Sequence, residues 1–145
     1  MWVSRRTDYA TRAVLSLSLA DEALNLDQLA EATEAPRSVL GQVMPRLRAA
    51  GIARSVRGPG GGYRLNHPSA ELTLERVVRV FEGQLAPIGY ATRYEPDPCP
   101  AIVARSLRPA WEEIRDATIT ILDRINFADL AEAARVEGKH ASSRR

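Results

Sequence analysis

The sequence contains very little cysteine and lysine: Cys99 is the only cysteine, and 19 of the 20 basic residues are arginines. One cysteine cannot form a disulfide within the chain, so a cytoplasmic location is expected. No apolar run reaches the roughly 20 residues of a membrane-spanning helix, and the start of the chain lacks the features of a secretory signal. The sequence therefore predicts no membrane partner.

Acidic residues are absent from a long internal segment, residues 35–70. This segment contains six arginines, Arg37, Arg46, Arg48, Arg54, Arg57 and Arg64, whereas acidic and basic residues nearly balance over residues 71–145. A local positive field of this kind is typical of a surface that binds a polyanion. The alternative is that an arginine-rich composition brings these residues together without function.

The overall composition is that of one globular domain. Apolar residues make up 45% of the 145 residues and charged residues 26%, which is the usual balance for a protein that buries a hydrophobic core. This length leaves no room for a second independent domain.

Three N-terminal segments have the apolar spacing of helices. The first begins after a cap at Ser4 and continues to about Ala20. The second begins at Asn25, which together with Gln28 matches a capping box, and ends near Thr33. The third covers residues 38–50 and ends before Gly51. Since only a short link separates the second and third segments, they predict a helix-turn-helix with the third segment as recognition helix.

The next segment has the pattern of a β-hairpin. Residues 52–56 and 63–65 alternate as strands do, and the connection between them contains four glycines and a proline. We interpret this hairpin as the wing of a winged helix-turn-helix. A further helix is predicted from a cap at Thr73 to Glu82.

Residues 84–100 contain too many prolines and glycines for a regular element, and they are interpreted as a sensor loop or a tether. The following helix has an apolar seam suited to pairing with a second copy, formed by Leu107, Trp111, Ile114, Thr118, Ile121 and Ile125. Pro109 marks either a kink or the start of this helix. The alternative is that the seam packs within one chain. Asn126 caps a last helical turn, and residues 137–145 are expected to be frayed.

The predicted fold is therefore mainly α with a small β-hairpin wing: a winged helix-turn-helix over residues 1–70, followed by a helix, a sensor loop and a long C-terminal dimerisation helix over residues 71–145.

Several motifs resemble one family. They are Ser4-Arg5-Arg6-Thr7-Asp8-Tyr9-Ala10, Leu47-Arg48-Ala49-Ala50-Gly51, the segment Ser55-Val56-Arg57-Gly58-Pro59-Gly60-Gly61-Gly62-Tyr63-Arg64-Leu65, and Phe127-Ala128-Asp129-Leu130, with Trp111 at the expected spacing. The sequence resembles the IscR-like winged-helix regulators, the repressors of iron-sulfur, nitric-oxide and cysteine metabolism. The resemblance implies a DNA-binding homodimer that regulates transcription, most simply as a repressor.

The recognition helix supplies the first candidate DNA contacts. Its N-terminal residues Arg37, Ser38 and Gln42 are placed to read base edges in the major groove, Arg37 at guanine and Gln42 at adenine. The alternative is that Arg37 contacts only phosphate and Gln42 only solvent. Arg46 and Arg48 are expected to contact phosphates.

Further candidates lie in the wing and the first helix. Arg57 stands beside Gly58, Pro59 and Gly60, where a slim backbone favours entry of the guanidinium group into a minor groove, and the resemblance implies the same role. Arg5, Arg6 and Tyr9 begin the first helix, where side chains and backbone N–H groups can hold a phosphate. Tyr9 is alternatively a core residue.

Two residues of the recognition helix depart from the family pattern. Gly41 stands where relatives often carry a longer polar residue, and Pro45 lies inside the helix, where it removes a hydrogen bond to Gly41. A flexible glycine four residues before the proline can accommodate a kink, which changes the bases that the helix reaches, so the operator sequence is not inferred from the family.

The cluster-binding members of the family have three cysteines before the dimerisation helix, whereas here only Cys99 is present, with Tyr90 and Arg105 near the other two positions. We therefore expect no cofactor and no metal site. An atypical iron-sulfur cluster, held by Cys99 with His67, Glu95, Asp97 or a partner chain, is the alternative. The other sensor hypothesis is a small-molecule effector pocket formed by Tyr90, Tyr94 and Trp111, or a redox response of Cys99.

The sequence also bears on two other functional classes. An enzyme is not expected, because no Lys-Ser/Thr pair follows the glycine run and no nucleophile-base grouping is present. A winged helix that binds only proteins remains the alternative, since a fold does not dictate its function.

Overall fold

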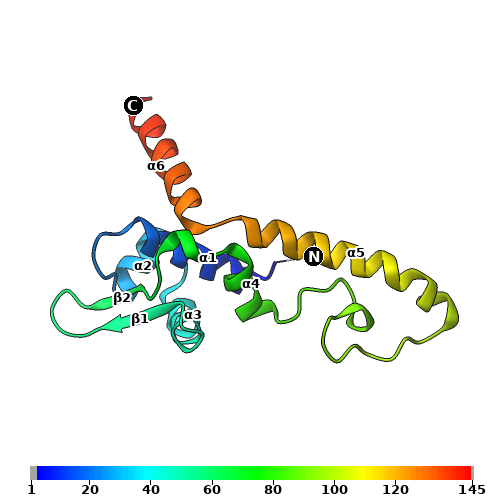
Figure 1. Cartoon of the computed structure of the whole chain (residues 1–145). Coiled ribbons are helices and arrows are strands. Elements are labelled where there is room, and N and C mark those ends of the chain that lie inside the picture. Colours follow the sequence, from blue (N-terminus) through cyan, green and yellow to red (C-terminus); the bar gives the residue numbers. More distant parts are fainter. Residues whose placement is uncertain (1–2, 145) are drawn as a thin grey trace.

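The computed structural model describes residues 3–144. Its elements in chain order are α1 (Arg5–Leu19), α2 (Leu26–Thr33), α3 (Arg37–Ala49), β1 (Ala53–Val56), β2 (Gly62–Leu65), η1 (Ser69–Glu71), α4 (Leu74–Glu82), η2 (Gly89–Ala91), α5 (Ile102–Arg124) and α6 (Phe127–Ser143). Figure 1 shows α1–α4 and the hairpin gathered in one head, from which α5 and α6 extend in different directions. The predicted mainly α fold with a β-hairpin wing is confirmed.

The predicted helix starts are confirmed by their caps. The Ser4 side chain accepts a hydrogen bond from the Thr7 backbone N–H at 3.2 Å. Asn25 and Gln28 form both hydrogen bonds of a capping box, each 2.9 Å long. Since each cap satisfies backbone donors that the helix itself leaves free, these residues fix where the helices begin.

One hydrophobic core holds the head together. α1, α2 and α3 pack against one another through residues that are almost completely buried, among them Ala13, Val14, Leu29, Leu40 and Met44. Leu72, Val77 and Phe127 belong to the same core cluster. The division of the chain at residue 70 remains a prediction, but the core of the head draws residues from both sides of it.

The wing is fastened to the segment before α2. In the antiparallel hairpin Ala53 faces Leu65 and Val56 faces Gly62. Leu24 donates to the Tyr63 carbonyl at 3.0 Å and Tyr63 donates to the Leu24 carbonyl at 2.8 Å. Gly62, at φ +147°, lies where an added Cβ would come within 2.3 Å of the Leu24 carbonyl oxygen. Only glycine therefore allows this close backbone approach.

The junction between α5 and α6 is fastened to the start of α4. Leu74 donates to the Ile125 carbonyl at 2.8 Å, and Phe127 donates to the Leu72 carbonyl at 3.0 Å. This junction places the first turn of α6 against the head, where Phe127 is 1% exposed. α5 itself leads away from the head (Figure 1).

The structure decides one alternative and corrects one expectation about the C-terminal helices. Pro109 was expected to mark either a kink or the start of the helix, and the start is excluded because α5 begins at Ile102 and Pro109 lies inside it. α6 continues to Ser143, whereas fraying was expected from Glu137. The residues of α6 include many strong helix formers, and the Arg135–Glu132 ion pair lies on its exposed surface. These local preferences are sufficient to extend the helix past Gly138.

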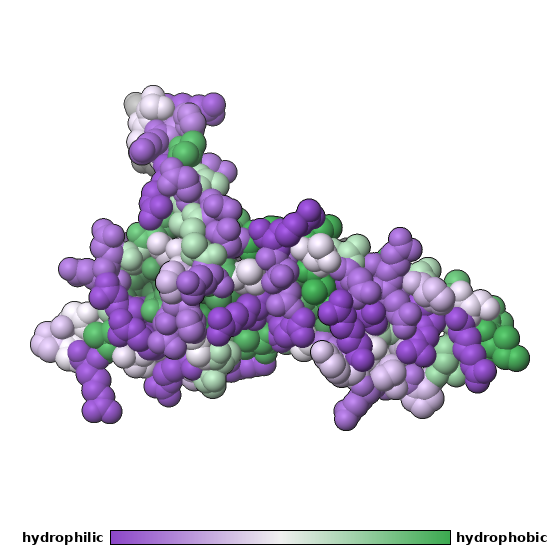
Figure 2. Space-filling model, viewed as in Figure 1, coloured by the Kyte–Doolittle hydropathy of each residue, from purple (hydrophilic) through white to green (hydrophobic). Residues whose placement is uncertain are grey.

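α5 leaves an apolar seam exposed. Its members recur in steps of four and three residues and are all exposed: Val103, Leu107, Ala110, Ile114, Ala117 and Ile121. Leu107, Ile114 and Ile121 belong to the predicted seam, whereas Trp111 and Ile125 are half-buried within the chain. Apolar side chains gather at the free end of α5 (Figure 2). The exposed seam is thus rotated slightly from the predicted one.

No helix among residues 3–144 is both long enough and apolar enough to cross a membrane.

Gly62→Ala is expected to lower the free energy of unfolding by about 2 kcal/mol or more, because a Cβ collides with the Leu24 backbone and the φ angle is strained. Chemical denaturation at a fixed protein concentration measures this change. The control is Gly138→Ala in α6, where nothing lies within 4 Å of the added Cβ, and where alanine should stabilise the helix by up to about 1 kcal/mol. Equal stability of the two variants would contradict the structure of the wing base.

Candidate nucleic-acid interface

α3 has one buried face and one exposed face. Leu40, Val43, Met44 and Leu47 are completely buried against the head. The opposite face is exposed and carries the predicted base-reading residues Arg37, Ser38 and Gln42, together with Gly41 and Pro45. The helix starts at Arg37 after Pro36, and no side chain forms a capping hydrogen bond at this end.

Arg37 is paired but remains available. Its Nε donates to the Asp27 carboxylate at 2.6 Å, and the two side chains are 62% and 77% exposed. An ion pair this exposed contributes little to stability, since water and salt screen it. Replacement of Asp27 by a phosphate or a base edge as the partner of Arg37 therefore costs little free energy.

The start of α1 lies beside α3. The Arg6 guanidinium donates to the Gln42 side-chain oxygen at 3.3 Å, which brings together two of the predicted contact residues from different helices. Arg5 is exposed as well. Tyr9 is half-buried against the core, and the Arg12 guanidinium lies 5.5 Å from the centre of its ring. Tyr9 thus has the core role named as its alternative and still leaves part of its surface exposed.

The first turn of α1 already holds a carboxylate. The Ser4 N–H donates to Glu82 at 2.8 Å, and the Thr7 hydroxyl donates to the same oxygen. These hydrogen bonds, that from Thr7 first and then those from Ser4, hold the pKa of Glu82 below its ordinary value. The expectation that the backbone at this terminus holds a phosphate needs correction, because Glu82 already occupies part of it. The side chains of Arg5 and Arg6 remain for that role.

The wing presents arginines around a tight turn. Gly61 donates to the Gly58 carbonyl at 2.9 Å, which closes the turn and leaves Arg57 exposed at its edge. Arg54 lies directly opposite Arg64 in the hairpin. Like charges placed in this way repel each other, so the hairpin favours an anion nearby. The Arg64 guanidinium also donates to the Asp21 carbonyl. Arg54 was not singled out from the sequence, although its alternating position in the strand was visible there.

Two arginines of the acid-free segment make contacts within the chain. Arg46 donates to the Val80 carbonyl at 2.7 Å, and its guanidinium lies 4.6 Å from the centre of the Phe81 ring. Arg48 donates to the Ser55 hydroxyl at 3.2 Å. Arg46 therefore holds α3 against α4, and Arg48 holds α3 against the wing. Their predicted phosphate contacts remain predictions, and neither side chain is as free as Arg57.

The chain as a whole is similar to known proteins. A family model described as an iron-dependent transcriptional regulator, Rrf2, matches residues 3–133. The chain belongs to the Rrf2 family. The HTH-type transcriptional regulator CymR of Bacillus subtilis is 32% identical over 107 residues, which cover 74% of this chain and 71% of CymR.

Solved structures of Rrf2 relatives have the same winged-helix fold. The structure of CymR, the global cysteine regulator of B. subtilis, has a TM-score of 0.75 at 27% identity and matches 92% of this chain and 98% of its own. The structure of T. potens IscR has a TM-score of 0.71 at 26% identity, over 92% and 88% of the two chains. The resemblance inferred from the sequence is thus confirmed, and this Rrf2 protein is a DNA-binding transcriptional regulator.

The loop before α5 is folded back on itself. The Asp97 N–H donates to the Gly89 carbonyl at 3.2 Å, and Gln84 forms two hydrogen bonds with the Tyr94 backbone, at 2.7 and 3.1 Å. Tyr90 is buried at 8% exposure, whereas Tyr94 is 66% exposed. These contacts give residues 84–100 a defined path along α5, although the segment has only one short turn of helix.

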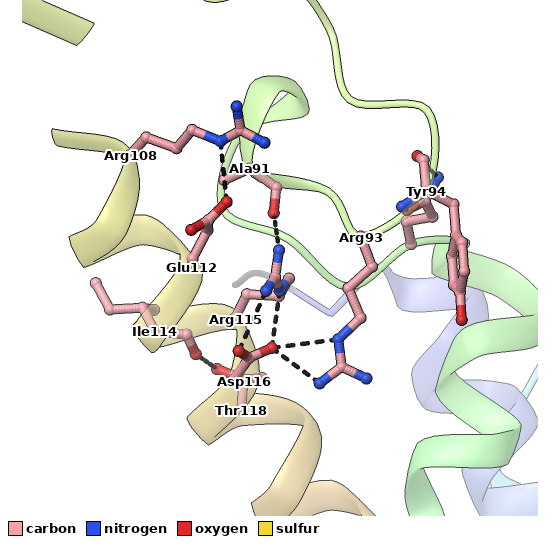
Figure 3. Close-up of polar contacts among 10 residues, drawn as sticks. Ala91, Arg93, Tyr94, Arg108, Glu112, Ile114, Arg115, Asp116 and Thr118 are labelled. Carbon is pink, nitrogen blue, oxygen red and sulfur yellow. Dashed lines mark hydrogen bonds and ion pairs between the residues drawn. The ribbon is translucent and has the colours of Figure 1, made fainter. Parts of the chain in front are cut away.

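Arginines that the sequence analysis missed lie where this loop meets α5 (Figure 3). The Arg115 guanidinium, 10% exposed, donates to the Ala91 carbonyl at 2.6 Å and to Asp116 at 2.9 Å. Arg93 from the loop donates to the same carboxylate, also at 2.9 Å. The hydrogen bond from Arg115, and to a smaller extent that from Arg93, lowers the pKa of Asp116 to about 2. The hydrogen bond to Asp116 in turn raises the pKa of Arg115. The loop is thus fastened to α5 by permanently charged groups.

Of the predicted sensor residues, Tyr94 lines a small pocket. This pocket lies between the end of α4, the loop and α5 and also includes Arg79, Arg93 and Arg115. Tyr90, Trp111 and Cys99 are not among its lining residues. The indole N–H of Trp111 is buried without a hydrogen-bond partner in the described part of the chain. The sequence indicates only one part of this pocket. Glu75 and Arg79 are four residues apart on a predicted helix, a spacing at which opposite charges pair.

The donor set does not fit the iron chemistry in the family's description. Across residues 3–144, no three His, Cys, Asp or Glu side chains come close enough together to hold a metal ion. Iron-sulfur clusters in proteins are held mainly by several thiolates, and Cys99 is the only thiol here. We therefore assign no role to iron in this chain.

Glu82→Gln is expected to lower the free energy of unfolding at pH 7 by on the order of 1 kcal/mol, since it weakens charge-assisted hydrogen bonds to α1. Because the pKa of Glu82 in the folded chain lies below its ordinary value of 4.5, its contribution is complete above that pH and is lost as the pH falls through the lower, folded value. Denaturation from pH 7 to pH 3 should therefore show the two proteins converging. Glu31→Gln, at an exposed site of α2, serves as control. A difference that is independent of pH would contradict the role of the carboxylate.

Proposed function

We propose that this Rrf2 protein is a homodimeric repressor that binds a palindromic operator with α3 and the wing. The observation that carries the proposal is the continuous exposed surface formed by α3, the start of α1 and the wing, in which Arg6 touches Gln42. We infer a cytoplasmic, non-enzymatic protein, as for the transcriptional regulators with which it is grouped.

The contacts differ in role along this surface. We assign Arg37, Ser38 and Gln42 to base edges of the major groove, because they lie at the uncapped N-terminus and outer face of α3. Arg57, with Gly58, Pro59 and Gly60, is assigned to the adjacent minor groove, where a guanidinium group is attracted by the local negative potential. Arg5, Arg6, Tyr9 and Arg48 are assigned to phosphates, and Arg46 primarily to the packing of α3.

Arg57→Ala is expected to weaken DNA binding about tenfold and to make the salt dependence of log affinity shallower by about one unit, because one cationic contact is lost. Fragments selected from genomic DNA by the wild-type protein serve as ligand, and fluorescence anisotropy at several salt concentrations measures affinity. The control is Arg135→Ala on α6, which also removes one positive charge but at a position outside the wing and α3.

The same measurement tests the alternative of a winged helix that binds only proteins. Weak binding that is unchanged by Arg57→Ala, and equal for selected and random fragments, would favour that alternative and reject the proposed operator contact. The absence of acidic residues from residues 35–70 supports the DNA-binding interpretation.

The proposal of a homodimer rests on the seam of α5. Leu107, Ile114 and Ile121 are 51%, 47% and 51% exposed, which is unusual for three aliphatic side chains on one face of a helix. These three residues are seven positions apart, and the whole exposed seam recurs in steps of four and three residues, as in helices that pair in parallel or antiparallel bundles. A second copy of the same seam is self-complementary around a two-fold axis, as a palindromic operator requires.

Ile114→Glu is expected to shift the protein from dimer to monomer at micromolar concentration, because a carboxylate would be buried in the proposed interface. Analytical ultracentrifugation measures the shift. Val136→Glu on α6 is the matched control, since Val136 is 44% exposed and lies outside the seam. A dimer that withstands Ile114→Glu, or a monomeric wild-type protein, would reject the interface.

We further propose that the protein responds to a small-molecule effector at the loop before α5. Hydrogen bonds join this loop to Gln84, just after α4, and to Arg115 and Asp116 of α5. A ligand bound where these three segments meet would contact all of them, which supports the proposal. A redox response of Cys99 remains the second candidate signal, supported only by its partial exposure.

A further inference from the structure

Three guanidinium groups line one small pocket. Arg79 comes from the last turn of α4, Arg93 from the loop and Arg115 from α5. Gln84 and Tyr94 complete its polar lining. We call this site the arginine pocket. It encloses about 10 Å³, space for about one water molecule, and is otherwise open to solvent. An anion would therefore lie at its mouth, against the guanidinium groups, rather than inside it.

The positive charge of the arginine pocket is only partly balanced. Glu75 pairs with Arg79, and Asp116 pairs with both Arg93 and Arg115, so two carboxylates face three guanidinium groups. Glu112 also lies near Arg115, but its carboxylate is bonded to Arg108 at 2.9 Å. The pocket therefore retains net positive charge.

Unused hydrogen-bond donors accompany this charge. Arg79 and Arg93 each bond their carboxylate through Nε and Nη2. Within residues 3–144, Nη1 of neither side chain has an acceptor, and both side chains are 46% exposed. Guanidinium groups with free N–H donors recognise oxyanions by charge and by paired hydrogen bonds.

The arginine pocket also adjoins the helix that holds the DNA-binding elements. Arg79 and Gln84 flank the last three residues of α4. Of these, Val80 and Phe81 hold Arg46 of α3, and Glu82 holds the first turn of α1. A ligand that moves Arg79 or Gln84 thus acts directly on the residues that position both helices.

We propose that the arginine pocket binds a small oxyanion, a phosphate or carboxylate group, and that the bound anion changes DNA affinity through the last turn of α4. Its effect on DNA rests on the proposed function, whereas binding of the anion does not.

Anion binding is measured first, without DNA. Inorganic phosphate and malonate are the probes, at an ionic strength held constant with sodium chloride. At about ten times its Kd, a bound anion should raise the Tm of the wild-type protein by about 3 °C. Arg79→Gln should abolish this shift, and Arg93→Gln is the second variant if Arg79→Gln does not fold.

Arg108→Gln is the matched control, because Arg108, like Arg79, pairs with a glutamate four residues away on its own helix but does not line the pocket. It should keep the full shift. The proposal is overturned if neither probe shifts the Tm of the wild-type protein, or if all variants show the same shift, which would indicate a general salt effect.

The effect on DNA is measured second, by anisotropy with selected fragments at the same ionic strength. Phosphate or malonate should change the affinity of the wild-type protein at least fivefold and leave that of Arg79→Gln unchanged. A bound anion that leaves DNA affinity unchanged would overturn the link through α4. If the wild-type protein binds no DNA, the proposed function fails, while the Tm shifts still decide whether the arginine pocket binds an anion.

Discussion

The last turn of α4 is the point on which the arrangement of the head depends. On one side it holds the recognition helix, because the Val80 carbonyl and the Phe81 ring receive the Arg46 guanidinium. On the other side Glu82 receives the Ser4 N–H and the Thr7 hydroxyl. These polar contacts add direction to a core that is otherwise apolar, since hydrophobic burial fixes distances but leaves helices free to slide. The last turn of α4 thus supplements the direct packing of α1 against α3 in the core.

Arginine has two different roles in this chain, and the surroundings of each side chain decide which. Arg57 has open solvent around it, and Arg37 has an exposed ion pair that exchanges readily. Arg46 and Arg115 hold elements together by donating to backbone carbonyls. Since a guanidinium group remains charged in all these places, net charge alone does not separate the exposed arginines that we assign to DNA from those that hold the fold.

Much of the fold was predictable because its signals are local. The caps at Ser4 and Asn25 and the glycine run of the wing act on neighbouring residues, and each was located from sequence correctly. Parts of the fold that depend on residues distant in the sequence were not predictable. The contact of Glu82 with α1 joins positions more than 70 residues apart, and nothing in the local sequence indicates it. The same holds for the arginine pocket, whose members come from three elements.

The candidate site was predictable to a similar degree. The exposed face of α3 follows from helical spacing, so the outward position of Arg37, Ser38 and Gln42 was recoverable from sequence. The contact of Arg46 with α4 was not predictable from the sequence. Helical spacing places Arg46 next to the exposed face of α3, and its partners Val80 and Phe81 come from a distant helix. The seam of α5 was recovered at Leu107, Ile114 and Ile121, but its edge at Trp111 depends on where the loop folds back.

The two backbone hydrogen bonds between Leu24 and Tyr63 have a consequence for operator architecture. They join the base of the hairpin to the residue that leads into α2, and Arg48 joins the hairpin to α3, so the hairpin and α3 keep a fixed relation. If one subunit binds two adjacent grooves as proposed, the head sets the interval between those grooves. Under the same proposal, the distance between the two half-sites is set instead by the geometry between subunits.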